Sequence, residues 1–250
     1  MKHVFYYLTL TPGSAAQGEV LLNGFPLMRD PVPARATWMD MVNLHLTAPE
    51  NRLQLRLRLA ASGTSVVLRL RRFEEEMIVT PEDGDPIELI GAIQDADGSV
   101  TLPATPDGLL TLDVRFRAPE FDFSEVYRAA PPVSQSAAVA FAQGLAEAFA
   151  GGDLQPLMDA SHDRILDLAI AYGRPVGEIE AAVRAEYSDM AAVGLAPPKA
   201  ARALAFADGR LVEPVAAGDA PLLVTLGAPE EGAEARLYIG LRRGRLQVSR

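Results

Sequence analysis

Residues 52–73 read RLQLRLRLAASGTSVVLRLRRF, and in the first half of this stretch leucine alternates with arginine or glutamine. Successive side chains of a β-strand point to opposite faces of its sheet. The alternation therefore predicts a strand with one apolar and one polar face. After residues 61–64 the pattern resumes with Val66, Leu68 and Leu70. We expect the two halves to form a hairpin at the centre of an antiparallel sheet.

The polar side of this hairpin is rich in arginine. Its members are Arg52, Arg56, Arg58, Arg69 and Arg71. Guanidinium groups on one side of neighbouring strands repel one another, so carboxylates or an anionic ligand are expected beside them. One hypothesis pairs them with the acidic tract of residues 74–97, which contains no Lys or Arg. The other makes them a binding site for an acidic protein partner or an anionic ligand, because the planar guanidinium group suits carboxylate and phosphate.

The rest of residues 1–130 continues in short alternating runs separated by turn residues. Asn23-Gly24 is typical of a tight two-residue hairpin turn, because both residues tolerate positive φ angles. Many short strands with regularly spaced turns are typical of a β-sandwich or barrel. We therefore predict an all-β sandwich domain over residues 1–130.

A change of pattern follows at residues 129–133, which read AAPPV and mark the expected domain boundary. Apolar residues then recur at helical spacing in three segments as far as about Met190, and after Pro197-Pro198 the spacing returns to that of strands. Helices followed by a run of strands predict an α+β domain with three helices and an antiparallel meander over residues 131–250.

Two family resemblances follow from these patterns. Residues 134–250, with three helices, the break FAGGD at residues 149–153 and a final meander, resemble the NTF2-like (cystatin-like) α+β cone. This resemblance implies a sheet wrapped around a long helix, with an apolar pocket in many members. The first domain, with Leu22-Asn23-Gly24 and a leucine-rich strand after Asn51, is similar to the jelly-roll sandwiches that bind sugars. That resemblance implies glycan binding through Asn23, Trp38 and Asn43.

Composition excludes several classes of protein. The net charge of −10 argues against nucleic-acid binding, which depends on clustered Lys and Arg. The absence of cysteine excludes disulfides and thiolate metal sites, and fits a cytoplasmic protein. No apolar run approaches the roughly 20 residues that span a bilayer. The N-terminal residues 1–17 favour a first strand, with a cleaved secretion signal as the alternative.

One histidine lies in a setting that suits chemistry. His162 is expected on the second helix of the α+β domain, between Asp159 and Asp163. A carboxylate beside an imidazole can orient it as a general base, so His162 and Asp163 are the candidate catalytic pair. Tyr172 and Tyr187 are further candidates for lining a pocket. A core or surface histidine is the simpler interpretation, because no second ligand or nucleophile lies at a recognisable spacing.

Catalytic motifs are absent from the sequence. It contains no G-x-S-x-G, glycine-rich phosphate loop, H-E-x-x-H or dinucleotide fingerprint. The leading hypothesis is therefore a non-catalytic, two-domain binding protein that uses the five arginines and needs no metal or cofactor. The alternatives are a small-molecule enzyme or carrier that uses a pocket in the α+β domain, and glycan binding by the sandwich. A homodimer formed through the C-terminal sheet is a further open alternative.

Overall fold

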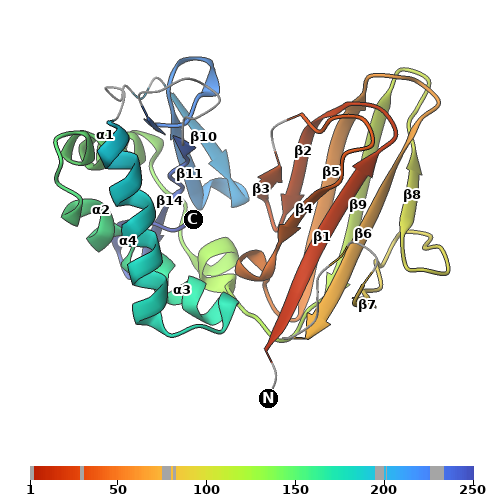
Figure 1. Cartoon of the computed structure of the whole chain (residues 1–250), viewed down its shortest axis with the longest axis horizontal. Helices are drawn as coiled ribbons and strands as arrows, with labels where there is room; N and C mark the ends of the chain where they lie inside the picture. Colours follow the sequence, from red (N-terminus) through yellow and green to blue (C-terminus); the bar gives the residue numbers. More distant parts are fainter. Residues whose placement is uncertain are drawn as a thin grey trace. The chain divides into compact units, whose positions relative to one another are not determined.

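In a computed structural model of the protein, the described residues are 3–28, 31–74, 80, 83–194, 200, 202–225 and 234–250. The fold is mixed, with antiparallel sheets and helices (Figure 1). The chain divides into two compact units, Met1–Ser124 and Glu125–Arg250. Within the described ranges, no helix combines the length and the apolar character that crossing a membrane requires.

The described part of the first unit consists mainly of antiparallel strands. They are β1 (Val4–Pro12), β2 (Ala16–Leu22), β3 (Phe25–Met28), β4 (Trp38–Met41), β5 (Glu50–Leu59), β6 (Ser65–Glu74), β7 (Asp85–Pro86), β8 (Val100–Pro103) and β9 (Leu109–Arg117). One sheet has the order β4-β1-β6-β7, with β8 also paired to β6, and the other has the order β3-β2-β5-β9. The two sheets form the two layers of this unit (Figure 1).

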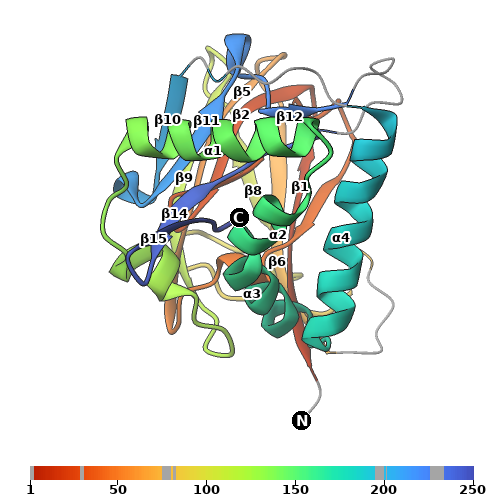
Figure 2. The same ribbon diagram turned by 90° about the vertical axis from the view of Figure 1, so that its left-hand side faces the viewer.

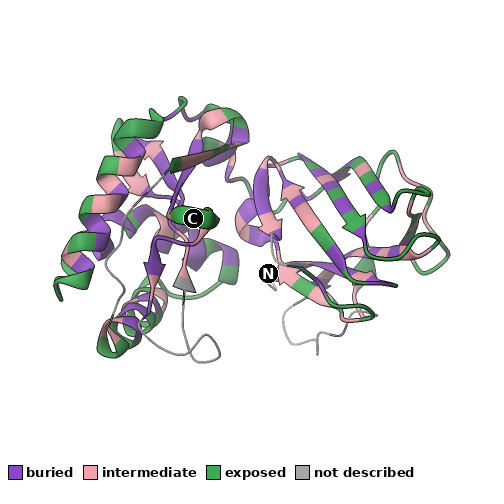
Figure 3. Cartoon of the chain, turned by 90° about the horizontal axis from the view of Figure 1, so that it is seen from above, coloured by how far each residue is buried: buried purple, intermediate pink, exposed green. Residues whose placement is uncertain are grey.

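The alternating leucines point into the core, as the sequence predicts. On β5, Leu53, Leu55, Leu57 and Leu59 are exposed by at most 4%. On β6, Leu68 and Leu70 are exposed by at most 1%. Figure 3 shows the resulting bands of buried and exposed residues along the strands. Both strands therefore supply one apolar face to the same core.

The predicted hairpin of residues 52–73 is wrong, because β5 and β6 belong to different sheets. β5 pairs with β2 and β9, whereas β6 pairs with β1, β7 and β8. The connection between them crosses from one sheet to the other. Alternation predicts which face of a strand is buried, but it does not predict which strand lies beside it.

The connection from β5 to β6 is hydrogen-bonded to the connection from β1 to β2, which also passes from one sheet to the other. The Ala60 N–H donates to the Ala15 carbonyl, and the Ala61 N–H donates to Ser14 Oγ. The Ser14 and Thr64 hydroxyls lie 3.0 Å apart and share a further hydrogen bond. The polar groups of the two connections therefore bond to one another, so they do not depend on a hairpin turn between β5 and β6 for their hydrogen bonds.

The second unit combines four α-helices with a small sheet in its described part. Its elements are a π-helical turn (Glu125–Ala129), α1 (Gln135–Ala150), α2 (Gln155–Ala160), α3 (His162–Tyr172), α4 (Val176–Val193), β10 (Arg202–Phe206), β11 (Leu211–Val215), β12 (Leu223–Val224), β13 (Glu234–Ala235), β14 (Ile239–Arg242) and β15 (Arg245–Val248). Helix α1 lies across β10, β11 and β14 (Figure 2). Its buried side chains, Leu145 and Phe149 among them, supply the core between helix and sheet.

Two details of the predicted α+β pattern differ. The expected second helix is interrupted at Ser161, whose φ of −93° and ψ of 1° leave the helical region, so α2 and α3 are separate helices. The meander runs β10-β11-β14-β15, and the short β12 pairs with β13 outside it. Both departures are local, since the antiparallel order of the main sheet follows the chain.

Candidate functional site

A polar hollow of about 520 Å³ lies in the second unit, and His162 is one of its walls. Helices α2, α3 and α4 line it, together with the β14–β15 turn and β15. Its polar lining residues are Gln155, Asp159, His162, Asp163, Glu180, Arg184, Arg243, Arg245 and Gln247. Its volume is within the range of small-molecule sites. We refer to it as the polar hollow.

The helix break at Ser161 sets the position of His162. Because α3 begins immediately after the break, His162 is its first residue and Asp163 its second. The Ile165 N–H bonds to the Ser161 carbonyl and closes the first turn of the new helix. His162 is exposed, whereas Asp163 is only 3% exposed.

The structure does not support the predicted catalytic pair of His162 and Asp163. Consecutive residues on a helix point in different directions. Asp163 faces Arg242, with Oδ2 lying 3.7 Å from Arg242 Nε. A carboxylate held there does not orient the exposed imidazole, so the described geometry gives His162 a place in the hollow without an orienting carboxylate from Asp163.

A buried ion network lies behind Asp163. Asp167 Oδ2 accepts hydrogen bonds from Arg242 Nη1 at 2.9 Å and from Arg250 Nη1 at 2.8 Å. Arg250 Nε donates to the Tyr127 hydroxyl at 2.7 Å. Burial raises the pKa of Tyr127 to about 12, although the nearby Arg250 charge lowers it. Tyr127 is therefore a neutral hydrogen-bond partner at physiological pH.

This network divides the four arginines near the C-terminus into a buried and an exposed pair. Arg242 and Arg250 are 9% and 5% exposed and pair with acids of α3. Only Arg243 and Arg245 are exposed. Alternation explains the difference, because β14 turns Arg242 towards the helices while the turn residue Arg243 lies outside the strand.

The exposed pair of arginines borders the polar hollow. The β14–β15 turn has positive φ at both Arg243 (50°) and Gly244 (75°). At the first of these positions Asn or Gly is usual, since other residues seldom adopt positive φ. Backbone preference therefore does not explain an arginine at position 243.

The acids that line the hollow are engaged by neighbouring side chains. Gln155 Nε2 donates to Asp159 Oδ1 at 2.6 Å, and Arg184 Nη2 donates to Glu180 Oε1 at 3.3 Å. Among the described residues, no such contact is found for the side chains of His162, Arg243 or Arg245. Arg243 and Arg245 are therefore the cationic side chains of the hollow that are left for a ligand.

Tyr172 and Tyr187 lie outside the lining of this hollow. Tyr187 is 3% exposed and packs edge-on against Phe149, with Arg164 Nη1 3.3 Å from its hydroxyl. Tyr172, the last residue of α3, is 42% exposed. Both were candidates for lining a pocket, but Tyr187 is part of the core between α4 and α1, and Tyr172 faces outward.

The five predicted arginines of the first unit do not form one surface. Arg52, Arg56 and Arg58 lie exposed on β5, whereas Arg69 and Arg71 lie on β6 in the other sheet. The two sets of arginines lie in different sheets because β5 and β6 do not form the predicted hairpin. A binding site that uses all five together is therefore excluded by their geometry.

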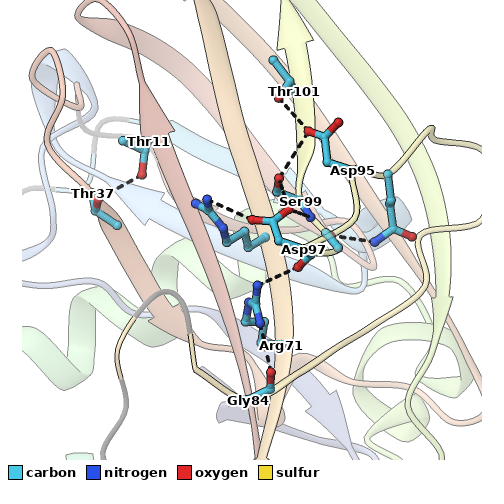
Figure 4. A network of polar contacts seen from close by, with 11 residues as sticks. Thr11, Thr37, Arg71, Gly84, Asp95, Asp97, Ser99 and Thr101 are labelled. Carbon is cyan, nitrogen blue, oxygen red and sulfur yellow. Dashed lines mark hydrogen bonds and ion pairs between the residues drawn. The ribbon is translucent and has the colours of Figure 1, made fainter.

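The acidic tract covers the two arginines of β6. Arg71 is 8% exposed and donates to the carbonyls of Gly84 (3.0 Å) and Asp97 (2.7 Å) (Figure 4). Arg69 Nη2 lies 3.4 Å from Asp97 Oδ2. Hydrogen bonds from Ser99, with a smaller effect of Arg69, hold the pKa of Asp97 at about 2. These two arginines hold residues 84–99 against β6, but only Arg69 pairs with a carboxylate of the tract, whereas Arg71 bonds to backbone carbonyls and not to the acids that the charge-pairing hypothesis expects.

The outer face of β5 gains two arginines that the sequence hypothesis left out. Arg115 and Arg117 of β9 project to the same side, because Arg52 lies opposite Arg115 in register and Glu50 opposite Arg117. We call Arg52, Arg56, Arg58, Arg115 and Arg117 the β5–β9 face. The alternation of residues 109–117 was the available signal, but only the pairing of β5 with β9 brings the two sets together.

Part of the β5–β9 face is already paired. Arg52 forms a two-pronged ion pair with Asp113, with Nε 2.8 Å from Oδ1, and Arg115 Nη1 lies 3.1 Å from Glu50 Oε1. The hydrogen bond from Arg52 is the largest cause that lowers the pKa of Asp113. Arg56 lies opposite Glu19 and Thr111 in register.

Two of the three residues expected to bind a glycan form hydrogen bonds within the fold. Asn43 is fully buried, accepts from the Tyr6 N–H at 2.7 Å and donates to the Val4 carbonyl at 2.9 Å. Asn23 donates to the His45 carbonyl and to Asn51. Trp38 borders a separate apolar groove of about 270 Å³. These three side chains therefore do not converge on one sugar site.

Among the described residues, no group of three His, Asp or Glu side chains is arranged to hold a metal ion. Comparison with known proteins finds no matching family model, no matching curated protein and no matching solved structure. The polar hollow and the β5–β9 face are the two features of the described residues that bear on function.

Proposed function

We propose that the protein binds a small anionic molecule in the polar hollow of the second unit, and that it acts as a binding protein rather than through a His–Asp catalytic pair. The observation that carries this proposal is the gathering of Arg243, Arg245 and His162 around one hollow. The carboxylates beside them, Asp159 and Glu180, are engaged by their own neighbours. An anion therefore meets donors without displacing an internal ion pair.

The chemistry of arginine supports this choice of ligand class. A guanidinium group binds carboxylate or phosphate through paired hydrogen bonds, and such charge-assisted bonds are stronger than neutral ones. The first turn of α3, where His162 lies, adds the positive end of a helix dipole. A carboxylate or phosphate ester is thus the expected ligand.

Calorimetric titration with succinate, glutarate and inorganic phosphate tests the proposal. We expect the double variant with Arg243→Gln and Arg245→Gln to bind these anions about tenfold or more weakly than the unmodified protein. Each substitution removes a charge-assisted hydrogen bond to the ligand. Arg174→Gln, an exposed arginine of the same unit outside the hollow, is the matched control. Equal binding by the double variant and the control would remove the hollow from consideration.

A second candidate function rests on the β5–β9 face, which we propose as a docking surface for an acidic protein partner. Its support is the number of arginines that two paired strands project to one side. Arg56→Glu combined with Arg117→Glu should abolish the binding of a polyglutamate peptide in fluorescence anisotropy at low salt. Arg35→Glu, an exposed arginine outside this face, should not change it. Undiminished binding by the double variant argues against the face.

We propose a β-sandwich for the first unit and an NTF2-like α+β cone for the second, in a cytoplasmic protein. The two-layered sheets of the first unit and helix α1 across the sheet of the second support these assignments. A homodimer through the edge strand β15 is testable by sedimentation, with a concentration-dependent mass as the supporting result.

A further inference from the structure

We infer that the acidic partner of the β5–β9 face binds as an extended segment that adds a strand to the open edge of β9. This inference rests on the second function proposed above, because the arginines of that face attract the partner. It adds the backbone contacts that fix the segment in place. Addition of a strand to a sheet edge is a common way for a domain to bind an extended peptide.

Strand β9 is the edge of its sheet, and its outer side is covered at one end only. On its inner side β9 pairs with β5 along its whole length. On its outer side the Ile90 N–H donates to the Arg115 carbonyl at 2.7 Å, and the Arg115 N–H donates to the Ile90 carbonyl at 3.1 Å. Gly91 then has φ of 102°, and the Ala92 N–H bonds back to the Leu89 carbonyl. The chain therefore turns away from β9 after this single bridge.

The bridge at Arg115 shows which backbone groups of β9 point outward. Because the backbone groups of a strand alternate between its two neighbours, those of Thr111 and Asp113 point to the same side as those of Arg115. The Leu109 carbonyl, which accepts from the Thr105 N–H at 2.8 Å, fits the same alternation. Among the described residues, no partner is found for the N–H or the carbonyl of Thr111 or Asp113. Four backbone groups of β9 are therefore open to an incoming strand.

This edge lacks the features that usually protect an edge strand. Natural edge strands are kept short, or they carry proline or an inward-pointing charge. The other outer strands of the first unit are short, since β3, β4, β7 and β8 have at most four residues each. In contrast, β9 has nine residues without proline, and its inward-facing positions are all apolar. Its open backbone groups are therefore suited to pair with another strand.

Space for a strand is present beside the open groups. A hollow of about 430 Å³ lies there, lined by Arg52, Ile90, Asp113, Val114 and Arg115. Leu112, which lies between the two open residues and points inward, is only half-buried, whereas Leu110 and Val114 are buried. An added strand covers the apolar surface that the edge leaves exposed at Leu112, so its addition is favoured by burial as well as by hydrogen bonds.

The two faces of β9 determine which segment fits. Paired strands place opposing side chains on the same face. On the outer face the segment lies near Arg115 and Arg56, and Arg56 has no ion pair among the described residues. On the inner face it lies near Leu112. Acidic residues alternating with apolar ones match both faces. A second copy of β9 would bring two sets of arginines together, and like charges repel, so charge favours the acidic segment.

Two peptides of equal composition test the inference on the full chain. The capped peptide EVEVEV alternates acidic and apolar residues, and EEEVVV has the same residues in two blocks. In fluorescence anisotropy at low salt, we expect EVEVEV to bind about tenfold tighter, the effect of one or two backbone hydrogen bonds. Equal affinities overturn the inference, and the docking surface stands if polyglutamate still binds through Arg56 and Arg117. Absence of binding by both peptides and by polyglutamate overturns both proposals.

A proline substitution places the preference at the edge of β9. Thr111→Pro removes the outward N–H without removing a hydrogen bond to β5, and Thr111→Val is the matched control that keeps this N–H. We expect Thr111→Pro to reduce the preference for EVEVEV to about twofold or less, and Thr111→Val to retain it. An unchanged preference in folded Thr111→Pro overturns the inference. A dimer in sedimentation that Thr111→Pro abolishes assigns the edge to a second copy, which also overturns it.

A modified peptide gives the same test if Thr111→Pro does not fold. EVEVEV with all its backbone amides N-methylated keeps its charges and side chains but has no N–H to donate. We expect this peptide to bind the unmodified protein no tighter than EEEVVV does. Tight binding that survives N-methylation would show that side chains alone produce the preference, and it overturns the added strand.

Discussion

Single residues show how burial changes the properties of a carboxylate. Asp40, on the edge strand β4, is removed from water enough to raise its pKa to about 6, although a hydrogen bond from the Met41 backbone lowers it. The described residues give Asp40 no arginine or lysine partner, so the loss of hydration is the largest cause of this shift.

The shifted pKa of Asp40 predicts a pH dependence of stability. The folded protein keeps a proton on Asp40 between pH 4 and 6, where the unfolded chain has lost it, so stability falls as the pH rises through this window. We expect Asp40→Asn to remove this loss and to be more stable than the unmodified protein by about 1–2 kcal/mol at pH 7, after allowance for partial exposure. Urea unfolding at pH 4 and pH 7 measures the free energy of unfolding of both proteins. A stability difference between variant and unmodified protein that is the same at both pH values contradicts the prediction.

Asp167 gives the opposite test. Because its Oδ2 accepts from both Arg242 and Arg250, Asp167→Asn leaves two buried guanidinium groups with less compensating charge. We expect a loss of about 3–5 kcal/mol in the free energy of unfolding, as when one partner of a buried ion pair is removed. Urea denaturation measures it against Asp189→Asn, an exposed acid of α4. Equal stability of the two variants would argue against the buried network.

At the scale of elements, local signals predict local structure well. Asn23 and Gly24 adopt the positive φ angles of 53° and 81° that the β2–β3 turn requires. Ser134 caps α1 by accepting from the Ala137 N–H, and Gly173 ends α3 with φ of 64°. These features depend on a few consecutive residues, so the sequence contains the whole cause.

Features that depend on distant residues were not predictable in the same way. The separation of β5 from β6 follows from pairing with β2, β9 and β1, which no local pattern specifies. The residues of the candidate site also differ in whether the sequence predicts them. His162 was found because its neighbours in sequence are acidic, whereas Arg243, Arg245 and Gln247 join it only through the fold.

The close approach of β2 and β5 predicts the effect of a glycine substitution. Gly18 has φ of 141°, and a Cβ atom there would lie 2.1 Å from the Arg56 carbonyl oxygen. Gly18→Ala must therefore separate the strands, with an expected loss of about 2–4 kcal/mol. Gly63→Ala is the matched control, since Gly63 also has positive φ (72°) but no atom within 4 Å of the added Cβ. The expected loss of stability for Gly63→Ala is about 1 kcal/mol, from backbone strain alone. Thermal unfolding of both variants therefore shows how much of the Gly18→Ala loss comes from the steric clash.

For the whole molecule, each compact unit has a core of its own. Residues such as Leu55 and Leu68 belong to the first, and Phe149 and Ile239 to the second. A unit with its own core and internal hydrogen bonds is expected to fold alone. We predict that residues 1–124 and 125–250, expressed separately, each unfold cooperatively in circular dichroism. A fragment without a cooperative transition would show that it depends on the other.

The crossing between β5 and β6 has a consequence for synthesis. Strand β5 lies between β2, which precedes it in the chain, and β9, which ends at Arg117. While the ribosome makes residues 60–117, one edge of β5 has no partner, and open edges of this kind associate with other chains. The arginines that alternate along β5 give nascent chains a repulsive charge during that interval.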